Sequence, residues 1–234
     1  MKARLSDKKE IATGTLWVQY KVEENFSFKP GQYMFINLIK PPYSDEKGTT
    51  RHFSIVSSPN QKGVLEMATR LRDSAFKKSL KEMALGTEVE IQRIAGTFTL
   101  PDNLEKPLVF IAGGIGITPF MSMLKFIAEE KLPVKITLLY SNRDKNSTAF
   151  FADLEALQSQ IPNLKLVMTM TQDPTWQGEK RRIDSQFIKE YFPEVNENTY
   201  YVVGPTPMVD AVEKALQEAG VTPENIKIEN FSGY

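Results

Sequence analysis

The sequence predicts two domains, an antiparallel β-barrel over residues 1–103 and a parallel α/β sheet over residues 104–234. The chain length of 234 residues suits either one large domain or two small ones. Up to about residue 100, short alternating runs are separated by turn residues, whereas from about residue 105 long apolar runs alternate with amphipathic helical segments. Near-continuous apolar strands are typical of a parallel sheet that is covered on both faces. The change of pattern therefore marks a second domain.

The first domain shows runs rich in β-branched and aromatic residues, which predict strands at 14–22, 31–39, 52–58, 64–71 and 88–94. Their spacing is typical of a small antiparallel barrel or sandwich. One segment is different, because apolar residues of 73–86 recur at helical spacing, with Asp73 or Ser74 as the N-cap and Gly86 as a stop. We expect the aromatic residues of this domain to form its core, namely Trp17, Tyr20, Phe26, Phe28 and Phe35.

The second domain alternates predicted strands with predicted helices. The strands are expected at 107–112, 134–141, 164–171, 199–204 and 226–231. The helices are expected between them, at 119–130, 149–161, 184–192 and 207–220. This order predicts a Rossmann-like sheet, joined to the barrel through residues 100–107.

The composition excludes several function classes. Lysine plus arginine and aspartate plus glutamate each number 29, so the net charge is zero and a nucleic-acid partner is not expected. Cysteine is absent, which excludes disulfides, thiolate nucleophiles and cysteine-held zinc or iron–sulfur clusters. We expect no metal site, so redox chemistry requires a bound organic cofactor. Neither a signal peptide nor a run of about 18 apolar residues is found, which predicts a cytoplasmic protein.

The stretch AGGIGITP, residues 112–119, follows the first predicted strand of the second domain. Open α/β sheets bind ligands at the carboxyl ends of their strands. Gly113, Gly114 and Gly116 let backbone amides approach a phosphate, because no Cβ stands in the way. Thr118 suits the cap of the following helix and Pro119 its first turn. The stretch predicts an anion-binding loop, with a tight turn that needs glycine only for steric reasons as the alternative.

The stretch RHFS, residues 51–54, opens a strand of the first domain. Alternate residues of a strand share a face, so Arg51 and Phe53 should point the same way and His52 the other. A fixed guanidinium binds phosphate through paired hydrogen bonds, and an aromatic ring stacks on a flat heterocycle. Alternatively, Arg51 is a solvated cation that covers an apolar neighbour. His52, the only histidine, is expected to be structural or at the surface.

These stretches belong to a longer series of motifs along the chain. The series is GQY at 31–33, RHFS at 51–54, RLRDSAFKKSL at 70–80, GTFTL at 96–100, GGIGITP at 113–119, YSNR at 140–143, GPTPM at 204–208 and ENFSGY at 229–234. In order and spacing it resembles the ferredoxin-NADP reductase superfamily of flavoproteins. The resemblance covers almost the whole chain. It implies an N-terminal Greek-key barrel that binds FAD and a C-terminal Rossmann-like domain that binds NAD(P)H, with the flavin ring at their interface.

The resemblance also implies roles for individual residues. Arg51 would grip the flavin phosphates, Phe53 would stack on the isoalloxazine ring, and Ser54 would hydrogen-bond near flavin N5. The amides at the N-terminus of the 70–80 segment would face the FAD pyrophosphate. A C-terminal aromatic, Phe231 or Tyr234, would cover the ring face where nicotinamide stacks. A tail that is simply packed into the domain interface is the alternative for these last residues.

The expected catalytic residues are Ser54, Phe231 and Tyr234. The residues expected to bind cofactors are Arg51, His52, Phe53, Ser54, Thr69, Arg70, Ser74, Ala75, Phe76, Gly113, Gly114, Gly116, Thr118, Pro119, Ser141, Arg143, Gly204, Pro205, Met208 and Phe231.

Two positions depart from the family pattern. Most relatives carry Tyr where Phe53 stands, and many carry Cys where Val203 stands. Flavin binding should survive, because the ring face remains. Hydride transfer is expected to be slower, or to take its geometry from Ser54 and the C-terminal aromatics.

The nucleotide preference is expected to be NADPH rather than NADH. Ser141 and Arg143 follow the second strand of the α/β domain, where relatives that prefer NADPH place Ser and Arg around the 2′-phosphate. Arg181 or Arg182 could contribute as well, or could belong to a solvated basic turn. FMN in place of FAD remains open, because adenine contacts are poorly signalled.

We therefore expect an FAD-dependent NAD(P)H oxidoreductase that exchanges electrons with a ferredoxin, a flavodoxin, free flavin or a partner oxygenase. The alternative is a non-catalytic FAD-binding electron-transfer subunit of a larger redox complex. The sequence shows no cysteine-rich extension that would hold an iron–sulfur cluster, which favours the enzyme.

Overall fold

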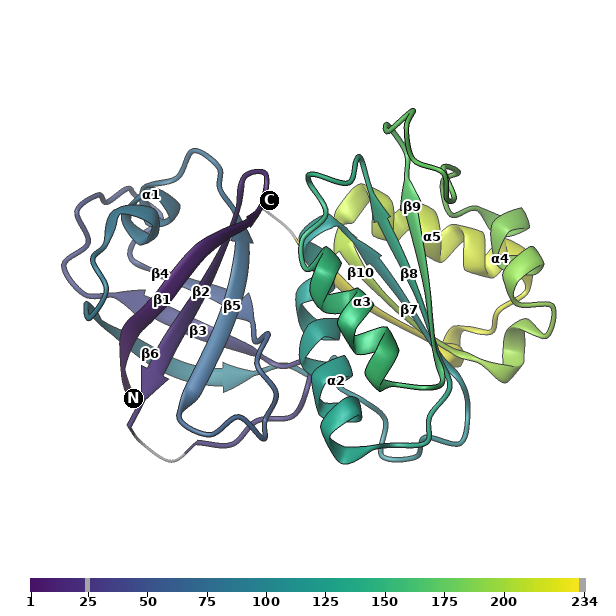
Figure 1. Ribbon diagram of the computed structural model, residues 1–234, viewed down its shortest axis with the longest axis horizontal. Helices are drawn as coiled ribbons and strands as arrows, with labels where there is room; N and C mark the ends of the chain where they lie inside the picture. The colour runs from purple at the N-terminus through teal and green to yellow at the C-terminus, as the bar shows by residue number, and fades with distance from the viewer. Residues whose placement is uncertain (24–25, 232–234) are drawn as a thin grey trace. The chain divides into compact units, whose positions relative to one another are not determined.

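The computed structural model describes residues 1–23 and 26–231 and divides into two compact units (Figure 1). The first unit holds Met1–Leu100 together with Thr118–Glu129. The second holds Pro101–Ile117 and the described residues from Glu130 onward. A division into domains between residues 103 and 104 stays a prediction, and the units differ from it in grouping the helical segment Thr118–Glu129 with the barrel.

The first unit contains an antiparallel sheet that curls into a barrel. Among the described residues it has six strands: β1 Lys2–Ala12, β2 Thr15–Val22, β3 Tyr33–Leu38, β4 Thr50–Ser54, β5 Val64–Arg70 and β6 Glu88–Ala95. Their order is β4-β3-β6-β1-β2-β5, with antiparallel pairing throughout. The two outer strands approach each other, because the Val56 amide just after β4 donates to the Glu66 carbonyl in β5 at 2.8 Å. The antiparallel barrel is confirmed.

Strand β1 was not expected from the sequence. Its residues are mostly charged or polar, and only Ala3 and Leu5 are buried. It nevertheless pairs with β2 along most of its length and with β6 over Lys2–Arg4. Irregular register after Leu5 and after Glu10 disturbs the alternation that a sequence pattern depends on. The strand is specified by its two neighbours more than by its own residues.

The barrel core follows the inward residues of each strand. In β3, Met34, Ile36 and Leu38 are fully or almost fully buried. Phe35 lies between them in sequence and so points outward, where it contacts the His52 ring at 5.7 Å between centroids. The expectation that Phe35 is a core residue is therefore wrong, while Tyr20 and Phe28 do belong to the core.

Helix α1 (Ala75–Glu82) lies against one part of this core, in the segment that the sequence predicted to be helical. Its N-cap is Ser74, whose side chain accepts a hydrogen bond from the Lys77 amide at 3.2 Å. Phe76 and Leu80 bury the apolar face of the helix. Gly86, with φ +86°, turns the chain after the helix.

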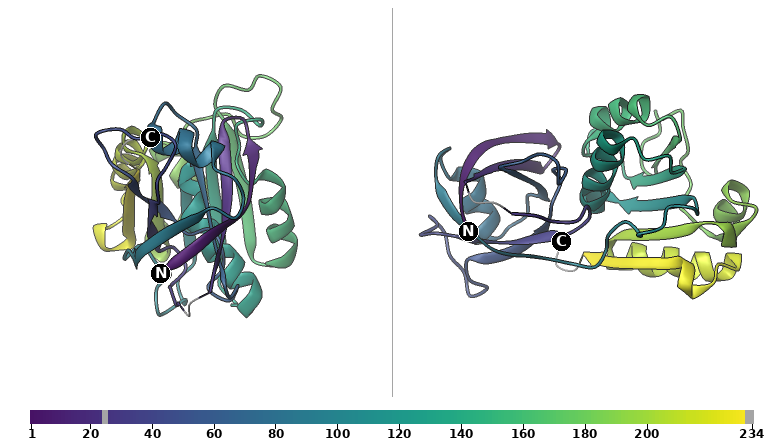
Figure 2. Two further views of the ribbon diagram at one scale, coloured as in Figure 1. Left: turned by 90° about the vertical axis from the view of Figure 1, so that its left-hand side faces the viewer. Right: turned by 90° about the horizontal axis from the view of Figure 1, so that it is seen from below.

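The second unit contains a parallel sheet with helices on both faces (Figure 2). The strands that the structure describes here are β7 Leu108–Gly113, β8 Ile136–Asn142, β9 Leu164–Met170, β10 Thr199–Pro205 and β11 Ile226–Phe231, in the order β11-β10-β7-β8-β9. The α-helices that follow the strands are α2 Ile117–Glu130, α3 Phe151–Gln160, α4 Ser185–Tyr191 and α5 Thr206–Ala219, and short 3₁₀ turns are η1 Gly114–Gly116, η2 Val195–Glu197 and η3 Pro223–Asn225. Helix α3 lies on one face of the sheet, and α4 and α5 lie on the other (Figure 1). The Rossmann-like α/β expectation is confirmed.

Helix α2 is attached to the barrel by side-chain contacts within the first unit. The Lys125 ammonium forms an ion pair with Glu66 of β5 at 2.7 Å, and that carboxylate is mostly buried. The Ser122 hydroxyl donates to the Ser57 carbonyl at 2.7 Å, and the Ser58 hydroxyl donates to Glu129. A mostly buried carboxylate needs such a partner, because leaving it unpaired is costly. These contacts explain why the segment groups with the barrel.

No helix in the described part of the chain is both long enough and apolar enough to cross a bilayer.

Candidate functional site

Strand β4 orients the RHFS residues as the two-residue period predicts. Arg51 pairs with Ile36 and Phe53 with Met34, and both partners have inward, fully buried side chains. Arg51 and Phe53 therefore share the inner face of the strand. His52 faces outward, and its ring lies 5.4 Å from the Tyr33 ring.

The Arg51 guanidinium is held by the loop before its own strand. Its Nη1 donates to the carbonyls of Lys47 at 2.8 Å, Gly48 at 3.1 Å and Thr50 at 2.7 Å. Its carbon Cζ lies 5.5 Å from the Phe76 ring centroid at the start of α1. The cation is thus preorganised beside the N-terminus of that helix.

One carboxylate joins this cation to the helix end. Asp45 Oδ1 lies 3.5 Å from Arg51 Nη2, and Asp45 Oδ2 accepts a hydrogen bond from the Ala75 amide at 3.3 Å. Nearby, Lys77 is largely buried, and burial, with the Arg72 and Arg51 guanidiniums close by, lowers the pKa of Lys77 to about 8. We call the Arg51 guanidinium and the Ala75 amide the anion cradle. The positive end of a helix and a fixed arginine suit a phosphate group.

Other predicted flavin residues lie in varied surroundings. The Phe53 ring is only 3% exposed and packs against Phe76, with ring centroids 5.6 Å apart. A flavin that stacks on Phe53 would therefore need covering side chains to move. Ser54 and Thr69 are also buried. Arg70 donates from Nη1 to the Thr15 hydroxyl at 2.6 Å, at the start of β2.

The two predicted nucleotide loops meet at the carboxyl ends of β7 and β10. A Cβ on Gly116 would lie 2.5 Å from the Val203 carbonyl oxygen, and one on Gly204 would lie 3.2 Å from the Gly113 Cα. A Cβ on Gly113 would overlap the Met208 sulfur. These glycines are thus needed for close packing, which is the steric role considered above, and binding of a phosphate remains a prediction.

The turn between β7 and α2 has its own local causes. Gly114 adopts φ +53°, which disfavours a side chain, and its carbonyl accepts a hydrogen bond from the Tyr140 hydroxyl at 3.0 Å. Helix α2 begins at Ile117, so Thr118 and Pro119 lie within its first turn, and Thr118 is not the flanking cap residue. Pro205 precedes α5 as its N-cap and makes no side-chain cap bond. The prediction that these loops bind phosphate therefore rests on their backbone amides.

Two of the residues expected to bind the nucleotide lie at the carboxyl end of β8, Ser141 within the strand and Arg143 just after it. Ser141 accepts a hydrogen bond from the Thr169 hydroxyl at 3.1 Å. Arg143 is exposed, and its guanidinium makes no hydrogen bond or ion pair with any other residue that the structure describes. Arg181 differs, because it is paired with Glu179 and Glu190, each at 2.8 Å. Arg143 is therefore better suited than Arg181 to receive a phosphate.

Two polar residues near these loops were missed in the sequence. Asn142, at the end of β8, is 6% exposed, and neither of its amide atoms has a hydrogen-bond partner among the described residues. Glu229 in β11 has one carboxylate oxygen that is buried and equally without a partner in the described chain. Burial raises the pKa of Glu229 to about 7. In the sequence, Asn142 lies inside the YSNR motif and Glu229 inside the ENFSGY motif, and this was the only indication of a role for them.

The Glu229 pKa predicts a pH-dependent stability. Its ordinary value is 4.5, so the folded chain retains a proton between about pH 4.5 and 7 that the unfolded chain releases. Folding favours the neutral form, so stability present at low pH is lost as the pH rises through this window, by at most about 3 kcal/mol. Glu229→Gln should flatten that loss, measured as the free energy of unfolding in urea at about pH 5 and about pH 8. An unchanged pH dependence in the variant would contradict the assignment.

Phe231 is the last residue of β11, and its side chain is partly buried. Tyr234 lies outside the described residues, so its predicted role has no structural counterpart here. Within the described ranges, no group of three or more His, Asp or Glu side chains is placed to hold a metal ion.

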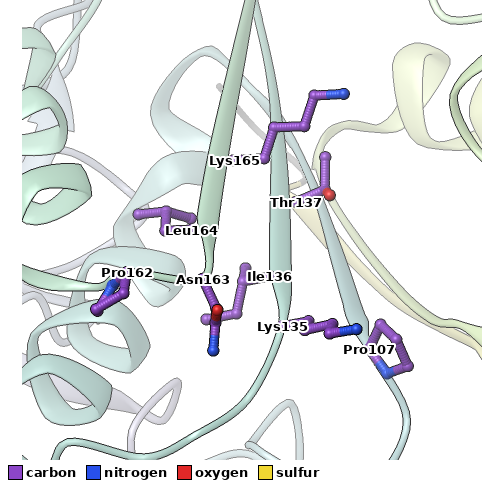
Figure 3. Close-up of a pocket in the computed structure, with 8 residues that line it drawn as sticks. All are labelled: Pro107, Lys135, Ile136, Thr137, Pro162, Asn163, Leu164 and Lys165. Carbon is purple, nitrogen blue, oxygen red and sulfur yellow. The ribbon is translucent and has the colours of Figure 1, made fainter.

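Two cavities lie at opposite edges of the parallel sheet. One, of about 330 Å³, lies at the amino ends of β7, β8 and β9, near Pro107, Lys135 and Asn163 (Figure 3). The other, of about 420 Å³, is lined by loops after β8 and β9, including Lys145 and Trp176. Only the second shares the carboxyl edge where α/β sheets bind nucleotides. The first cavity is therefore not assigned to the nucleotide.

Comparison with known proteins agrees with this arrangement. A model described as "Oxidoreductase FAD-binding domain" matches residues 2–100, and one described as "Oxidoreductase NAD-binding domain" matches residues 110–214. The toluate 1,2-dioxygenase electron transfer component of Pseudomonas putida is 27% identical over 233 residues, covering 98% of this chain and 67% of that protein. The glycine betaine monooxygenase reductase subunit of Chromohalobacter salexigens is 26% identical over 212 residues, covering 88% of this chain and 56% of that protein. The chain thus spans about half to two thirds of the length of these relatives.

A solved structure shares the whole fold. The flavohem-like FAD/NAD binding domain of nitric oxide dioxygenase from Vibrio cholerae superposes with a TM-score of 0.88, at 19% identity, over 98% of each chain. Its likeness extends to both the barrel and the parallel sheet. With the two domain models following one another on these two sheets, the chain belongs to the ferredoxin-NADP reductase superfamily of flavoproteins, as a FAD-binding oxidoreductase domain followed by a NAD-binding one.

Proposed function

We propose that the protein is an FAD-dependent NAD(P)H oxidoreductase that passes electrons to a separate acceptor. The observation that carries this proposal is the anion cradle. Arg51 and the first amide of α1 converge on one carboxylate, at the place where family resemblance puts the flavin phosphates. The two domain models, matched in order, support the pairing of a flavin with a pyridine nucleotide.

The protein's share of the mechanism is binding and orientation. When bound, FAD supplies the hydride and single-electron chemistry, which no side chain provides. Arg51 and the amides of α1 would hold its phosphates. The glycine loops after β7 and β10 would fix the nucleotide through backbone amides. We assign no dedicated acid or base to the hydride step itself.

Three residues complete the proposed site around the flavin ring. Ser54 would donate a hydrogen bond near flavin N5, and Phe53 would face the ring. Phe231, or Tyr234 beyond the described residues, would cover the ring face until the nucleotide arrives. A tail that only docks the terminus remains the alternative to this lid.

Nucleotide preference is proposed to be for NADPH, through Arg143. Its guanidinium is exposed and unpaired within the described chain, and a dianionic 2′-phosphate favours such a cation. Arg143→Ala should lower kcat/KM for NADPH by about tenfold and leave that for NADH within about twofold. Arg182→Ala, which removes another exposed cation, is the comparison variant. Equal losses with both nucleotides would remove Arg143 from the discrimination, and a selective loss in Arg182→Ala would transfer it there.

The acceptor is proposed to be a small electron carrier or an oxygenase component. The relatives described above are named as an electron transfer component of a dioxygenase and a reductase subunit of a monooxygenase. A ferredoxin, a flavodoxin or free flavin would serve the same chemistry. Because those relatives are longer than this chain, a non-catalytic FAD-binding subunit of a larger redox complex is the second candidate.

A steady-state assay tests the proposed function. The protein is loaded with FAD, or with FMN in parallel, and NADH or NADPH oxidation is followed with ferricyanide and then with cytochrome c as acceptors. Turnover that depends on added flavin is expected, with both acceptors reduced. Flavin binding without turnover would favour the second candidate, and failure to bind either flavin would overturn both.

A further inference from the structure

The segment before β4 lies alongside helix α1 and is bonded to it. Residues 39–49 contact it through Tyr43, whose amide donates to the Ser79 hydroxyl and whose carbonyl accepts from the same hydroxyl, both at 3.0 Å. The Tyr43 hydroxyl donates to Glu82 at 2.7 Å, and Lys78 lies 3.9 Å from the Tyr43 ring centroid. The segment is therefore fixed to the helix at Ser79 and Glu82, about one turn or more along α1 from the Ala75 amide of the anion cradle.

The same segment brings Asp45 to the N-terminal end of the helix. Asp45 accepts from the Ala75 amide at 3.3 Å and lies 3.5 Å from the Arg51 guanidinium. It also stabilises its own turn, because its carboxylate accepts from the Lys47 amide at 3.0 Å and its carbonyl from the Gly48 amide at 3.0 Å. The turn thus holds a carboxylate on both donors of the cradle.

A carboxylate and a phosphate compete for such donors because both are anionic oxygen acceptors. Two further cations lie close to the Arg51 guanidinium, because Arg72 and Arg51 both lower the pKa of Lys77. Asp73 and Glu46 are acidic neighbours of Ala75 and Asp45 in sequence. Repulsion among these cations is relieved by one anion in the cradle. Two anions at hydrogen-bond distance from the same donors would repel each other.

We propose that Asp45 is an internal anion that occupies the cofactor's phosphate site in the flavin-free protein, so that flavin binding requires its displacement. This inference rests on the proposed function, since it takes a flavin phosphate as the competitor. The turn at residues 45–48 then moves on binding, while the Tyr43 contacts keep the segment attached to α1. Asp45 thereby lowers the affinity for phosphate-bearing flavins and leaves riboflavin, which has no phosphate, unaffected.

Flavin binding to the cofactor-stripped full chain tests this proposal. Asp45→Asn removes the charge and keeps an acceptor for the Lys47 amide. Glu46→Gln removes an equal charge from an exposed neighbour, which has no hydrogen bond or ion pair with the cradle in the part of the chain that the structure describes. Asp45→Ser serves as a second variant, with thermal unfolding to verify the fold. Dissociation constants for FAD and riboflavin are measured by flavin fluorescence at low and high salt.

We expect Asp45→Asn and Asp45→Ser to bind FAD about fivefold more tightly than the wild type, because a partly exposed ion pair contributes little more than that. The gain in affinity should be smaller at high salt, which screens the charges. The affinity of the Asp45 variants for riboflavin should equal that of the wild type. The Glu46→Gln variant should bind FAD as tightly as the wild type. Equal or weaker FAD binding in both Asp45 variants would overturn the proposal, as would a matching gain for riboflavin or in Glu46→Gln. A wild-type chain that binds no flavin would instead overturn the proposed function.

Discussion

Arg51→Gln is expected to weaken FAD binding by about 30-fold or more. A charge-assisted hydrogen bond contributes about 1.5–3 kcal/mol, and the guanidinium presents paired donors to a phosphate. Three carbonyl groups already hold the Arg51 side chain in place, so it loses little conformational entropy when the ligand binds. The dissociation constant is measured by the quenching of flavin fluorescence.

The matched control for this variant is Arg93→Gln. Arg93 lies over the outward ring of Phe35, 4.2 Å from its centroid, and contributes an equal charge on the other face of the barrel. Its loss should change FAD affinity by less than about twofold. If the Arg51 and Arg93 variants lose the same affinity, the effect is one of overall charge and the anion cradle has no special role.

Gly116→Ala is expected to weaken pyridine-nucleotide binding by about tenfold or more while FAD binding is retained. The added Cβ would meet the backbone of Val203 at 2.5 Å and that of Gly204 at 3.0 Å, and backbone atoms cannot move aside as side chains do. Overpacking of this kind costs about 1–3 kcal/mol and would displace the loop that should hold the nucleotide. Nucleotide affinity and flavin content are measured on the same preparation.

The comparison variant is Gly113→Ala, where the added Cβ meets the flexible Met208 side chain. Because the methionine can shift, this variant should lose less affinity than Gly116→Ala. Nucleotide binding that is unchanged in Gly116→Ala would show that the packing between the β7 and β10 loops does not position the ligand.

The elements with strong local signals were predictable. Strand β7 is buried along its entire length, as its unbroken apolar run indicated. Helix α1 begins after Ser74, one of the two caps that the sequence offered. The shared face of Arg51 and Phe53 followed from strand geometry alone, because a period of two holds in any regular strand.

Elements that depend on distant neighbours were not predictable. Strand β1 is stabilised by β2 and β6, which a search for local apolar alternation does not register. The outward position of Phe35 depends on the register of β3, since a shift by one residue exchanges the two faces.

The candidate site was predictable only in part for the same reason. The glycine loops and Arg51 are visible as motifs, but the contact of Asp45 with Arg51 and Ala75 joins a loop, a strand and a helix. The shielded carboxylate oxygen of Glu229 is likewise a property of the folded environment. The Asp45 contacts leave no pattern in the sequence, and for Glu229 the ENFSGY motif marks the position but not the burial of its carboxylate.

An anaerobic titration tests the central claim, that one chain holds a flavin and a pyridine nucleotide in redox contact. The chain is loaded with FAD, and its visible absorbance is followed as NADPH, or separately NADH, is added. The account predicts that an equimolar amount of nucleotide bleaches the flavin band and that readmitted oxygen or ferricyanide restores it. A yellow protein whose absorbance is unchanged by either nucleotide would contradict it.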